Sequence, residues 1–311
     1  MIGRNSYFRI GLFSLVLLGL SVLLLAGTGS DTASAEDTVH CRLKGSYTTS
    51  SVAWDVAVSE DYAYVANYMD GLLILDISDP TAPEYKGSID TRGYAEGIAV
   101  DGDYAFIADY RYGLAIMDVS SKSNPQKVGD CSVYEYAYDV VVVGNYAYVP
   151  DWSYGLDIID VSDKTDPRKV GRRDTDSAIG VAVSRNYAYV ADHTNGLVVI
   201  DISSKSNPKE VGHCEEAGES RDVVVRGDYA YVAASGNGLV VVDISDPSHP
   251  EKVGSCSAAS YSEGVELVGD YAYVGSGNNG LTVVDISDPE NPRKVGGLRH
   301  TWQHRGCGGC G

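Results

Sequence analysis

The sequence predicts an all-β protein, a β-propeller of six blades that each contain four antiparallel strands. A Tyr-Ala-Tyr or Tyr-Ala-Phe triplet recurs six times, at intervals of 42 residues with one interval of 41. Each triplet is followed by a Gly-Leu pair, and each unit ends at a proline. Four short strands in about 42 residues, repeated in tandem, are typical of a propeller blade. The triplets begin at Tyr62, Tyr104, Tyr146, Tyr187, Tyr229 and Tyr271.

The copy of the unit around Tyr187 shows why each strand is expected. Residues 187–191 place both tyrosines on one face, because side chains alternate along a strand. Gly196 follows in a turn and supplies a positive φ at little cost. Residues 197–202 are apolar and mostly β-branched, which suits a strand buried on both faces. A polar turn leads to a weaker fourth strand at residues 209–213, and residues 221–225 open the next unit.

Residues 1–35 precede the repeats and are predicted to be a secretory signal peptide or an uncleaved N-terminal anchor. Arg4 and Arg9 stand before an apolar run, and residues 33–35 read Ala-Ser-Ala, a small-x-small cleavage site. The run is also about as long as the shortest spanning helices. Either way we expect an extracellular or cell-surface protein, which contacts the membrane only through this segment if it is retained.

The charge of the chain limits its partners. The formal net charge is −19 and the sequence pI is about 4.5. Long-range repulsion therefore opposes binding to nucleic acid, and we expect no nucleic-acid partner. A protein or a glycan of the cell envelope is the expected partner.

The ends of the repeat region bear on how the ring closes. The propeller is assigned to residues 36–298, and residues 299–311 form an irregular tail that contains Cys, Gly and His. Residues 43–46 resemble the fourth strand at residues 85–88 and are expected to pair into the last blade, which removes two sheet edges. Residues 292–297 repeat the fourth strand again, so seven candidates compete for six outer positions. Six blades are expected, and an incomplete ring of seven is the alternative.

The repeated phrases resemble a known family. Residues 196–203 read Gly-Leu-Val-Val-Ile-Asp-Ile-Ser, and residues 71–78 and 238–245 are close variants. These phrases are similar to the LVIVD repeat, and the similarity extends over about residues 43–297. The resemblance implies bacterial or archaeal cell-surface proteins with a β-propeller fold, and it implies no agreed activity or catalytic motif.

One position of the repeat, near the start of the first strand of each unit, is alternately aspartate and glycine. We call the six residues at this position the Asp/Gly column. The aspartates are Asp55, Asp139 and Asp222. In a closed ring they would lie about a pseudo-three-fold axis at the channel mouth. Hard cations take six to eight oxygen ligands, part of them water, so one interpretation is a Ca²⁺ site or a water cluster. The other is that these aspartates bond backbone amides at a strand start. No other cofactor is predicted.

The turn after each second strand is the second candidate site. Units 1 to 4 carry an acid or amide beside an aromatic residue or histidine there, whereas units 5 and 6 carry small residues. Acidic groups among exposed aromatics suit sugar stacking or a protein interface. The alternative is ordinary turn chemistry. Trp54 and Tyr138 are expected on the same side. The predicted ligand-binding residues are Tyr68, Asp109, Tyr110, Asp151, Trp152, Asp192 and His193.

Other recurring residues have structural interpretations. The aspartate that ends each third strand is expected to cap backbone N–H groups of the following turn. Cys131, Cys214 and Cys256 occupy one position in three different units, too far apart for disulfides, and are expected to be small apolar residues. In the tail, His300, His304, Cys307 and Cys310 have a loose zinc-ligand spacing, and an irregular end is the alternative. The capping aspartates are Asp76, Asp118, Asp160, Asp201, Asp243 and Asp285.

Two functions fit these observations. The first is a binding, interaction or adhesion module at the cell surface, which uses the face that carries the first-strand starts and the turns. The second is an exported polysaccharide lyase or hydrolase that uses clustered carboxylates on that face, since glycosidase chemistry needs two carboxyls at a defined separation. Six units this alike leave little room for one asymmetric catalytic group, so binding is favoured and no catalytic residue is assigned.

Overall fold

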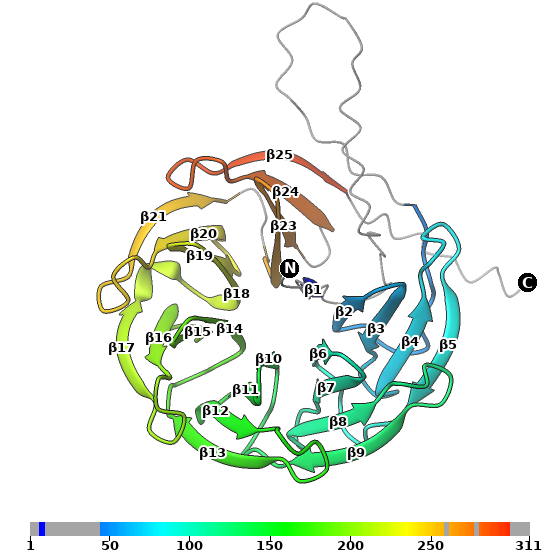
Figure 1. The fold of residues 1–311 in the computed structure, drawn as a ribbon. Helices are drawn as coiled ribbons and strands as arrows, with labels where there is room; N and C mark the ends of the chain where they lie inside the picture. The colour runs from blue at the N-terminus through cyan, green and yellow to red at the C-terminus, as the bar shows by residue number, and fades with distance from the viewer. Residues whose placement is uncertain (1–5, 10–43, 258–260, 277–279, 299–311) are drawn as a thin grey trace, which may run out of the picture.

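The computed structural model describes residues 6–9, 44–257, 261–276 and 280–298. Six antiparallel sheets surround a central axis, and in each sheet the strands follow chain order from the axis to the rim (Figure 1). The predicted fold class and the six blades of four strands are confirmed. In all six blades the ladder between the third and fourth strands contains a β-bulge at the same position, which bends the outer strand around the rim.

The strands of the first three blades begin and end as follows. Blade 1 contains β2 (Asp55–Ser59), β3 (Tyr62–Ala66), β4 (Leu72–Asp76) and β5 (Glu84–Ile89). Blade 2 contains β6 (Gly97–Asp101), β7 (Tyr104–Ala108), β8 (Leu114–Asp118) and β9 (Gln126–Cys131). Blade 3 contains β10 (Val141–Val143), β11 (Tyr146–Asp151), β12 (Gly155–Asp160) and β13 (Arg168–Arg173).

The other three blades repeat this order. Blade 4 contains β14 (Gly180–Ser184), β15 (Tyr187–Ala191), β16 (Leu197–Asp201) and β17 (Lys209–Cys214). Blade 5 follows a 3₁₀ turn, η1 (Glu215–Ala217), and contains β18 (Ser220–Arg226), β19 (Tyr229–Ala234), β20 (Gly238–Asp243) and β21 (Glu251–Cys256). Blade 6 contains β22 (Gly264–Val268), β23 (Tyr271–Gly275), β24 (Leu281–Asp285) and β25 (Arg293–Leu298).

The ring closes differently from the sequence prediction. The outer strand of blade 6 is β25, so the early segment does not take that place. Gly45 instead lies against the carbonyl of Pro80 in blade 1. Near the axis, β1 (Ser6–Arg9) pairs with the inner edge of β2 and also contacts β22 (Figure 1). These four residues belong to the predicted signal or anchor, yet they join blade 1. The assignment of residues 1–35 stays a prediction, because the apolar run lies outside the described residues.

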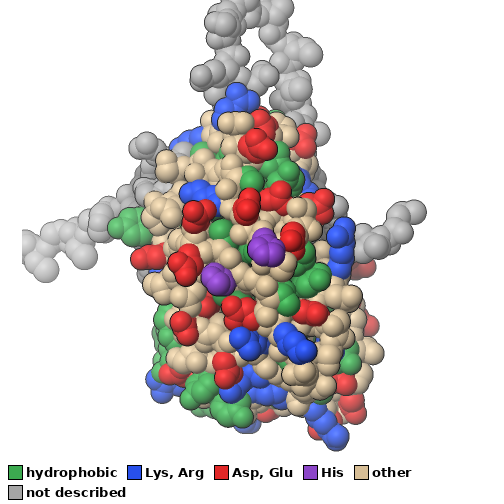
Figure 2. Space-filling model, turned by 90° about the vertical axis from the view of Figure 1, so that its left-hand side faces the viewer, with side chains coloured by type: hydrophobic (Ala, Val, Ile, Leu, Met, Phe, Trp, Pro, Cys, Tyr) green, Lys and Arg blue, Asp and Glu red, His purple; other side chains and the backbone are tan. Residues whose placement is uncertain are grey.

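Charged side chains are spread over the rim of the disc. Figure 2 shows acidic and basic groups mixed on the side formed by blades 4 and 5, without a continuous basic patch on that side. The six capping aspartates act as predicted, because each accepts a hydrogen bond from the backbone N–H two residues later. Among the described residues, no helix is long and apolar enough to cross a membrane. Cys131, Cys214 and Cys256 are free, and the zinc spacing of the tail lies outside the described residues.

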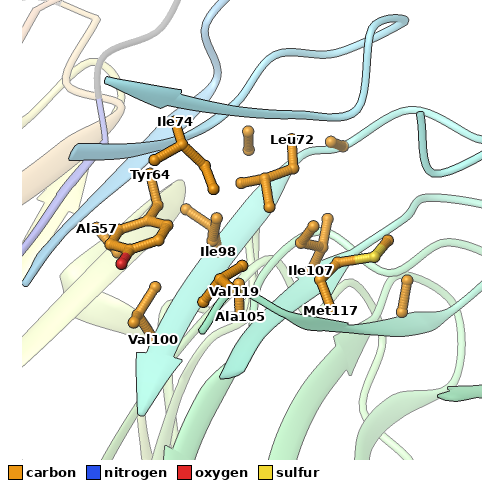
Figure 3. Close-up of a cluster of buried hydrophobic side chains, with 13 residues drawn as sticks. Ala57, Tyr64, Leu72, Ile74, Ile98, Val100, Ala105, Ile107, Met117 and Val119 are labelled. Atoms are coloured by element: carbon orange, nitrogen blue, oxygen red, sulfur yellow. The ribbon is translucent and has the colours of Figure 1, made fainter. Parts of the chain in front are cut away.

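The hydrophobic core is divided among the contacts between neighbouring blades. One cluster joins blades 1 and 2, where Tyr64 and Ile74 of one blade pack against Ile98, Ile107 and Met117 of the next (Figure 3). Four more clusters join the successive pairs up to blades 5 and 6. A sixth cluster lies on the other face of blade 1, with Tyr47 packed against it. The fold is therefore held by packing between blades, which fixes their starts and turns around one axis.

Candidate functional site

The turn after each second strand joins its blade to the next one through backbone atoms. The carbonyl oxygen of Tyr68 accepts a hydrogen bond from the Ala95 N–H of blade 2 at 3.0 Å. Tyr110, Trp152, His193 and Ser235 occupy the same place in blades 2 to 5, and each accepts an equivalent bond from the following blade. Tyr68, Tyr110 and His193 have φ values of 44°, 44° and 41°, in the left-handed region that side chains with a Cβ rarely adopt. Such strain persists where the surroundings impose it and is often found at functional sites.

The side chains of these turns take part in a continuous row of aromatic rings across blades 1 to 4, which we call the aromatic arc. Tyr68 stacks on Tyr94 and Tyr110 stacks on Tyr136, both with ring centroids 4.4 Å apart. The other neighbouring rings are tilted or edge-on, with centroids 5.6 to 6.1 Å apart. Arg111 lies over the Tyr136 ring, 5.3 Å from its centroid. The arc comprises Trp54, Tyr68, Tyr94, Tyr110, Tyr136, Tyr138, Trp152 and His193.

The arc borders a pocket at one mouth of the central channel, which we call the axial pocket. Its volume is about 390 Å³. Each blade contributes the residue that lies immediately before the Asp/Gly column, so six equivalent backbone positions surround the axis. These six side chains all line the pocket, and four further arc residues widen its wall on one side. The six are Trp54, Glu96, Tyr138, Ile179, Arg221 and Glu263, and the four are Tyr68, Tyr94, Tyr110 and Trp152.

The carboxylates predicted to bind a ligand lie beneath the arc. Asp109, Asp151 and Asp192 are each 0% exposed. Asp151 accepts hydrogen bonds from the backbone N–H groups of Tyr134, Glu135 and Tyr136. Asp192 accepts hydrogen bonds from the Thr175 hydroxyl and the Ser177 N–H of the loop before blade 4, and Asp109 accepts one from the Thr91 hydroxyl. These acids hold the loops that enter blades 2, 3 and 4, and they are the carboxylates on which the lyase or hydrolase alternative relied.

The aromatic residues and the histidine of the same predicted set lie at the surface. Tyr68, Tyr110, Trp152 and His193 are partly exposed members of the arc. Tyr68, Tyr110 and Trp152 also line the axial pocket. The structure therefore brings together the predicted rings and separates them from the predicted acids. That these residues bind a ligand stays a prediction.

The three aspartates of the Asp/Gly column link neighbouring blades. Asp55 accepts hydrogen bonds from Val56 N–H of its own blade and Ile98 N–H of the next, both at 2.8 Å. Asp139 and Asp222 form the same bridges to blades 4 and 6. A Cβ on Gly97 would lie 2.7 Å from the Cα of Asp139, so the glycine makes room for the next blade.

This bridging explains the alternation, and it agrees with the backbone-amide interpretation. The described residues contain no group of three His, Cys, Asp or Glu side chains placed to hold a metal ion. The carboxylates act as acceptors between inner strands. That these three aspartates also bind a calcium ion stays a prediction.

A second hollow lies on the rim, on the side seen in Figure 2. Its volume is about 590 Å³, and Arg173, Glu210, His213 and His249 are among its lining residues. The side chains of His213 and His249 are 56% and 78% exposed. This hollow lacks the enclosing rings that the axial pocket has, so the axial pocket is the stronger candidate.

The six repeats of the chain match one protein-family model. The LVIVD repeat matches six stretches of the chain, which coincide with the six blades: residues 51–91, 92–133, 135–175, 177–216, 217–258 and 259–298. The chain belongs to the LVIVD repeat family. Comparison with curated protein sequences gives no match.

Solved structures resemble the LVIVD-repeat protein in fold. A functionally unknown protein from Desulfotomaculum acetoxidans has a TM-score of 0.65 and 13% identity, and covers 81% of this chain and 87% of its own. A chain of the Mitotic Checkpoint Complex has a TM-score of 0.64 and 12% identity, over 77% of each chain. BamB from Moraxella catarrhalis has a TM-score of 0.52 and 12% identity, over 74% of this chain and 69% of its own. Identities this low support the fold alone.

Sequence reasoning missed several residues of the LVIVD-repeat site. Tyr94 and Tyr136 lie in the loops that follow the outer strands β5 and β9. They occupy the same repeat position, each before an alanine, but unit 4 has Ser177 there, so this Tyr-Ala signal is confined to two units. Glu96, Arg221 and Glu263 occupy the column just before the Asp/Gly column. A signal for that column exists, because its residue differs in type from unit to unit while the next position is only Asp or Gly.

The buried acid of blade 2 should make the stability of this LVIVD-repeat protein fall as pH rises. Burial raises the pKa of Asp109 to about 7, and the Thr91 hydrogen bond opposes this only in part. The folded state therefore holds the proton more tightly than the unfolded state, whose pKa is about 3.9. Stabilisation is fully present below about pH 4 and is lost by about pH 7, with a total of up to about 4 kcal/mol.

Urea denaturation at about pH 5 and pH 8 checks this effect in the wild type and in Asp109→Asn. The variant should lose much of the difference between the two pH values, because its amide does not ionise. Burial also raises the pKa of Asp157, to about 6, and this group should leave a smaller slope of the same sign. Equal slopes in the two proteins would contradict the assignment.

Proposed function

We propose that this LVIVD-repeat protein is an exported interaction module that binds a partner protein of the cell envelope through the aromatic arc. The observation that supports it is the continuity of the arc, which runs over four blades on one face and borders the axial pocket. At the sequence position of these turn rings, units 5 and 6 carry Ser235 and Gly277. A repeat that needed aromatic rings only for its own folding would carry them in every unit.

The composition of this face favours a protein partner. Protein interfaces are enriched in Tyr, Trp, Met and Arg relative to the rest of the surface. Met69 and Arg111 directly follow the arc residues Tyr68 and Tyr110 in the chain, and both are exposed. Met69 is 60% exposed and Tyr112 is 53% exposed. A glycan would use the rings but has less use for an exposed methionine.

Two further considerations support the proposal. The N-terminal sequence has the pattern of a secretory signal or anchor, which motivates export, and the intact mass of protein recovered outside the cell would show whether residues 1–35 are removed. The similar fold of a chain in the Mitotic Checkpoint Complex shows that such propellers occur within protein assemblies. That likeness is one of fold, so the proposal depends on the arc itself.

Truncation of two arc residues should abolish partner binding while the fold remains. Tyr110→Ala with Trp152→Ala removes the central stacked ring and the ring that continues the arc toward blade 4. Because buried aromatic anchors dominate interfaces, we expect retention of the partner to fall at least about 10-fold. The measurement is cross-linking of the full-length protein in envelope preparations, followed by quantification of the cross-linked protein band.

The matched control is Tyr85→Ala, since Tyr85 lies on the outer strand β5 and is 55% exposed. It should bind as well as the wild type. Unchanged cross-linking by the arc variant, with an unchanged melting temperature, would contradict the proposal. A glycan that binds the wild type and not the arc variant would replace the protein partner by a saccharide.

A further inference from the structure

The axial pocket has six different side chains at six equivalent backbone positions, and their chemistry is uneven. Aromatic rings line the side formed by blades 1 to 3. The opposite side, formed by blades 4 to 6, contributes Ile179, Arg221 and Glu263. Glu96 of blade 2 interrupts the aromatic side. The pocket thus combines many π faces with a small number of charges.

The charges of the pocket leave a negative excess. Two carboxylates, Glu96 and Glu263, face one guanidinium, that of Arg221. The Arg221 Nε donates a hydrogen bond to the Ser235 hydroxyl at 3.0 Å, which holds this cation on the blade 5 side. The protein as a whole has a formal net charge of −19. An anion would therefore be repelled both at long range and within the pocket.

The rings remain neutral and keep their electron-rich faces. Burial, followed by the charge of Glu96, raises the pKa of Tyr68, so its hydroxyl stays protonated. Burial and the neighbouring Tyr110 raise the pKa of Tyr138, and Glu96 adds to the effect. Glu96 lines the same pocket as Tyr68 and Tyr138, so its charge lies beside the rings. A cation bound among these rings would meet both the carboxylate and the ring faces.

The arc already holds a cation of its own. The Arg111 guanidinium lies 6.0 Å and 5.3 Å from the centroids of Tyr110 and Tyr136, and its Nη2 contacts the Tyr136 hydroxyl at 3.3 Å. Cations are attracted to ring faces, and quaternary and methylated ammonium groups are recognised in aromatic cages. Tyr110 belongs to both the Arg111 contact and the pocket wall.

We infer that the axial pocket binds an alkylammonium cation, in the form of a lysine side chain, a methylated lysine or a free quaternary ammonium head group. Trp54, Tyr138 and Trp152 would enclose the cation, Glu96 and Glu263 would balance its charge, and Ile179 would contact its methyl or methylene groups. This inference rests on the proposed function, because the pocket would be the point where the partner is anchored.

Titration calorimetry of the full-length protein with choline tests the charge requirement. The control ligand is 3,3-dimethyl-1-butanol, which has the same shape and no charge. We expect saturable binding of choline and at least about 10-fold weaker binding of the alcohol. A second pair of ligands is a peptide with one trimethyllysine and the same peptide with norleucine in its place. Tighter binding of the trimethyllysine peptide than of choline indicates a side chain of a partner, and tighter binding of choline indicates a small molecule.

Two substitutions in the pocket should change choline affinity in opposite directions. Glu263→Gln should weaken it about 5-fold, and Arg221→Gln should strengthen it by a similar factor, because each alters the charge by one unit. The affinity for 3,3-dimethyl-1-butanol should not change in either variant. If these residues had only a structural role, each substitution would lower the affinities for choline and for 3,3-dimethyl-1-butanol together. The melting temperature of each variant shows whether it is folded.

The outcomes separate the inference from the function on which it rests. Equal affinity for choline and the alcohol would contradict the inference that the pocket binds a cation, and so would tighter binding of a methyl glycoside than of choline. The proposed interaction module is unaffected by either result if the partner still binds. If no probe binds, and if the arc variant binds the partner as well as the wild type, both the cation inference and the proposed function are contradicted. Choline selectivity with opposite effects of the two substitutions supports the inference.

Discussion

Asp151→Ala should lower the free energy of unfolding by about 3 to 5 kcal/mol, since each of the three backbone donors that it leaves without an acceptor costs about 1 kcal/mol or more. The Asp151 carboxylate is 0% exposed. It accepts bonds from three successive backbone N–H groups, those of Tyr134, Glu135 and Tyr136, at 2.7, 3.1 and 2.9 Å. The alanine would leave three donors of an irregular loop without an acceptor. Urea denaturation followed by circular dichroism measures the loss.

The matched control is Asp76→Ala. The Asp76 carboxylate also accepts from a backbone N–H, that of Ser78, but it lies at the surface, where water replaces it. We expect a much smaller loss than in Asp151→Ala. Because the loop held by Asp151 carries Tyr136, the Asp151 variant should also weaken partner binding more than its fraction of folded protein explains. A loss in Asp151→Ala no larger than in Asp76→Ala would show that the loop is held by other contacts.

Gly171→Ala should be the second most damaging change, although it adds only one methyl group. A Cβ at Gly171 would lie 1.9 Å from the carbonyl oxygen of Lys205 in the next blade. The Cβ would be fixed to the backbone of strand β13, and the carbonyl belongs to the backbone of a tight turn, so neither can rotate away and the blades must move apart. Overpacking of this kind costs about 1 to 3 kcal/mol and sometimes more, and we expect the upper end. Thermal and urea unfolding of the variant measure the cost.

Gly236→Ala is the control for this substitution. No heavy atom lies within 4 Å of the position that its Cβ would take. It should change the free energy of unfolding by less than about 0.5 kcal/mol. Similar stabilities of the two variants would mean that the blades separate at little cost, and that the shared glycine of the outer strands has no packing role.

The sequence predicted the fold well because each blade is specified by local signals that occur six times. The alternation in Tyr-Ala-Tyr, the turn glycine and the apolar third strand each define one strand or turn, and repetition removes the ambiguity of a single copy. The capping role of Asp76 and its equivalents is local too, since carboxylate and N–H are two residues apart. Ring closure was harder to predict, because the place of Gly45 depends on a contact with the distant Pro80.

The site was predicted only in part, for two physical reasons. Neighbouring residues of a strand face opposite sides, so interest in Asp55 pointed away from the position just before it. At that position only the aromatic residues Trp54 and Tyr138 were expected to contribute, and Glu96 and Arg221 were missed. Burial of Asp109, Asp151 and Asp192 depends on loops of irregular sequence that fold over them. The aromatic neighbours Tyr68, Tyr110 and Trp152 were found, because a turn residue that interrupts a polar pattern is visible without knowledge of the loops.

The backbone links between blades have a consequence for which residues can vary among proteins of this family. The bonds that join each turn to the next blade use carbonyl and N–H groups, as in Tyr68 and Ala95. Such bonds are indifferent to the side chain, so evolution can exchange the six residues around the axial pocket without rebuilding the disc. Those six positions, read in chain order, would then act as a specificity code, and homologues with the same code should share a ligand even where the rest of their surfaces differ.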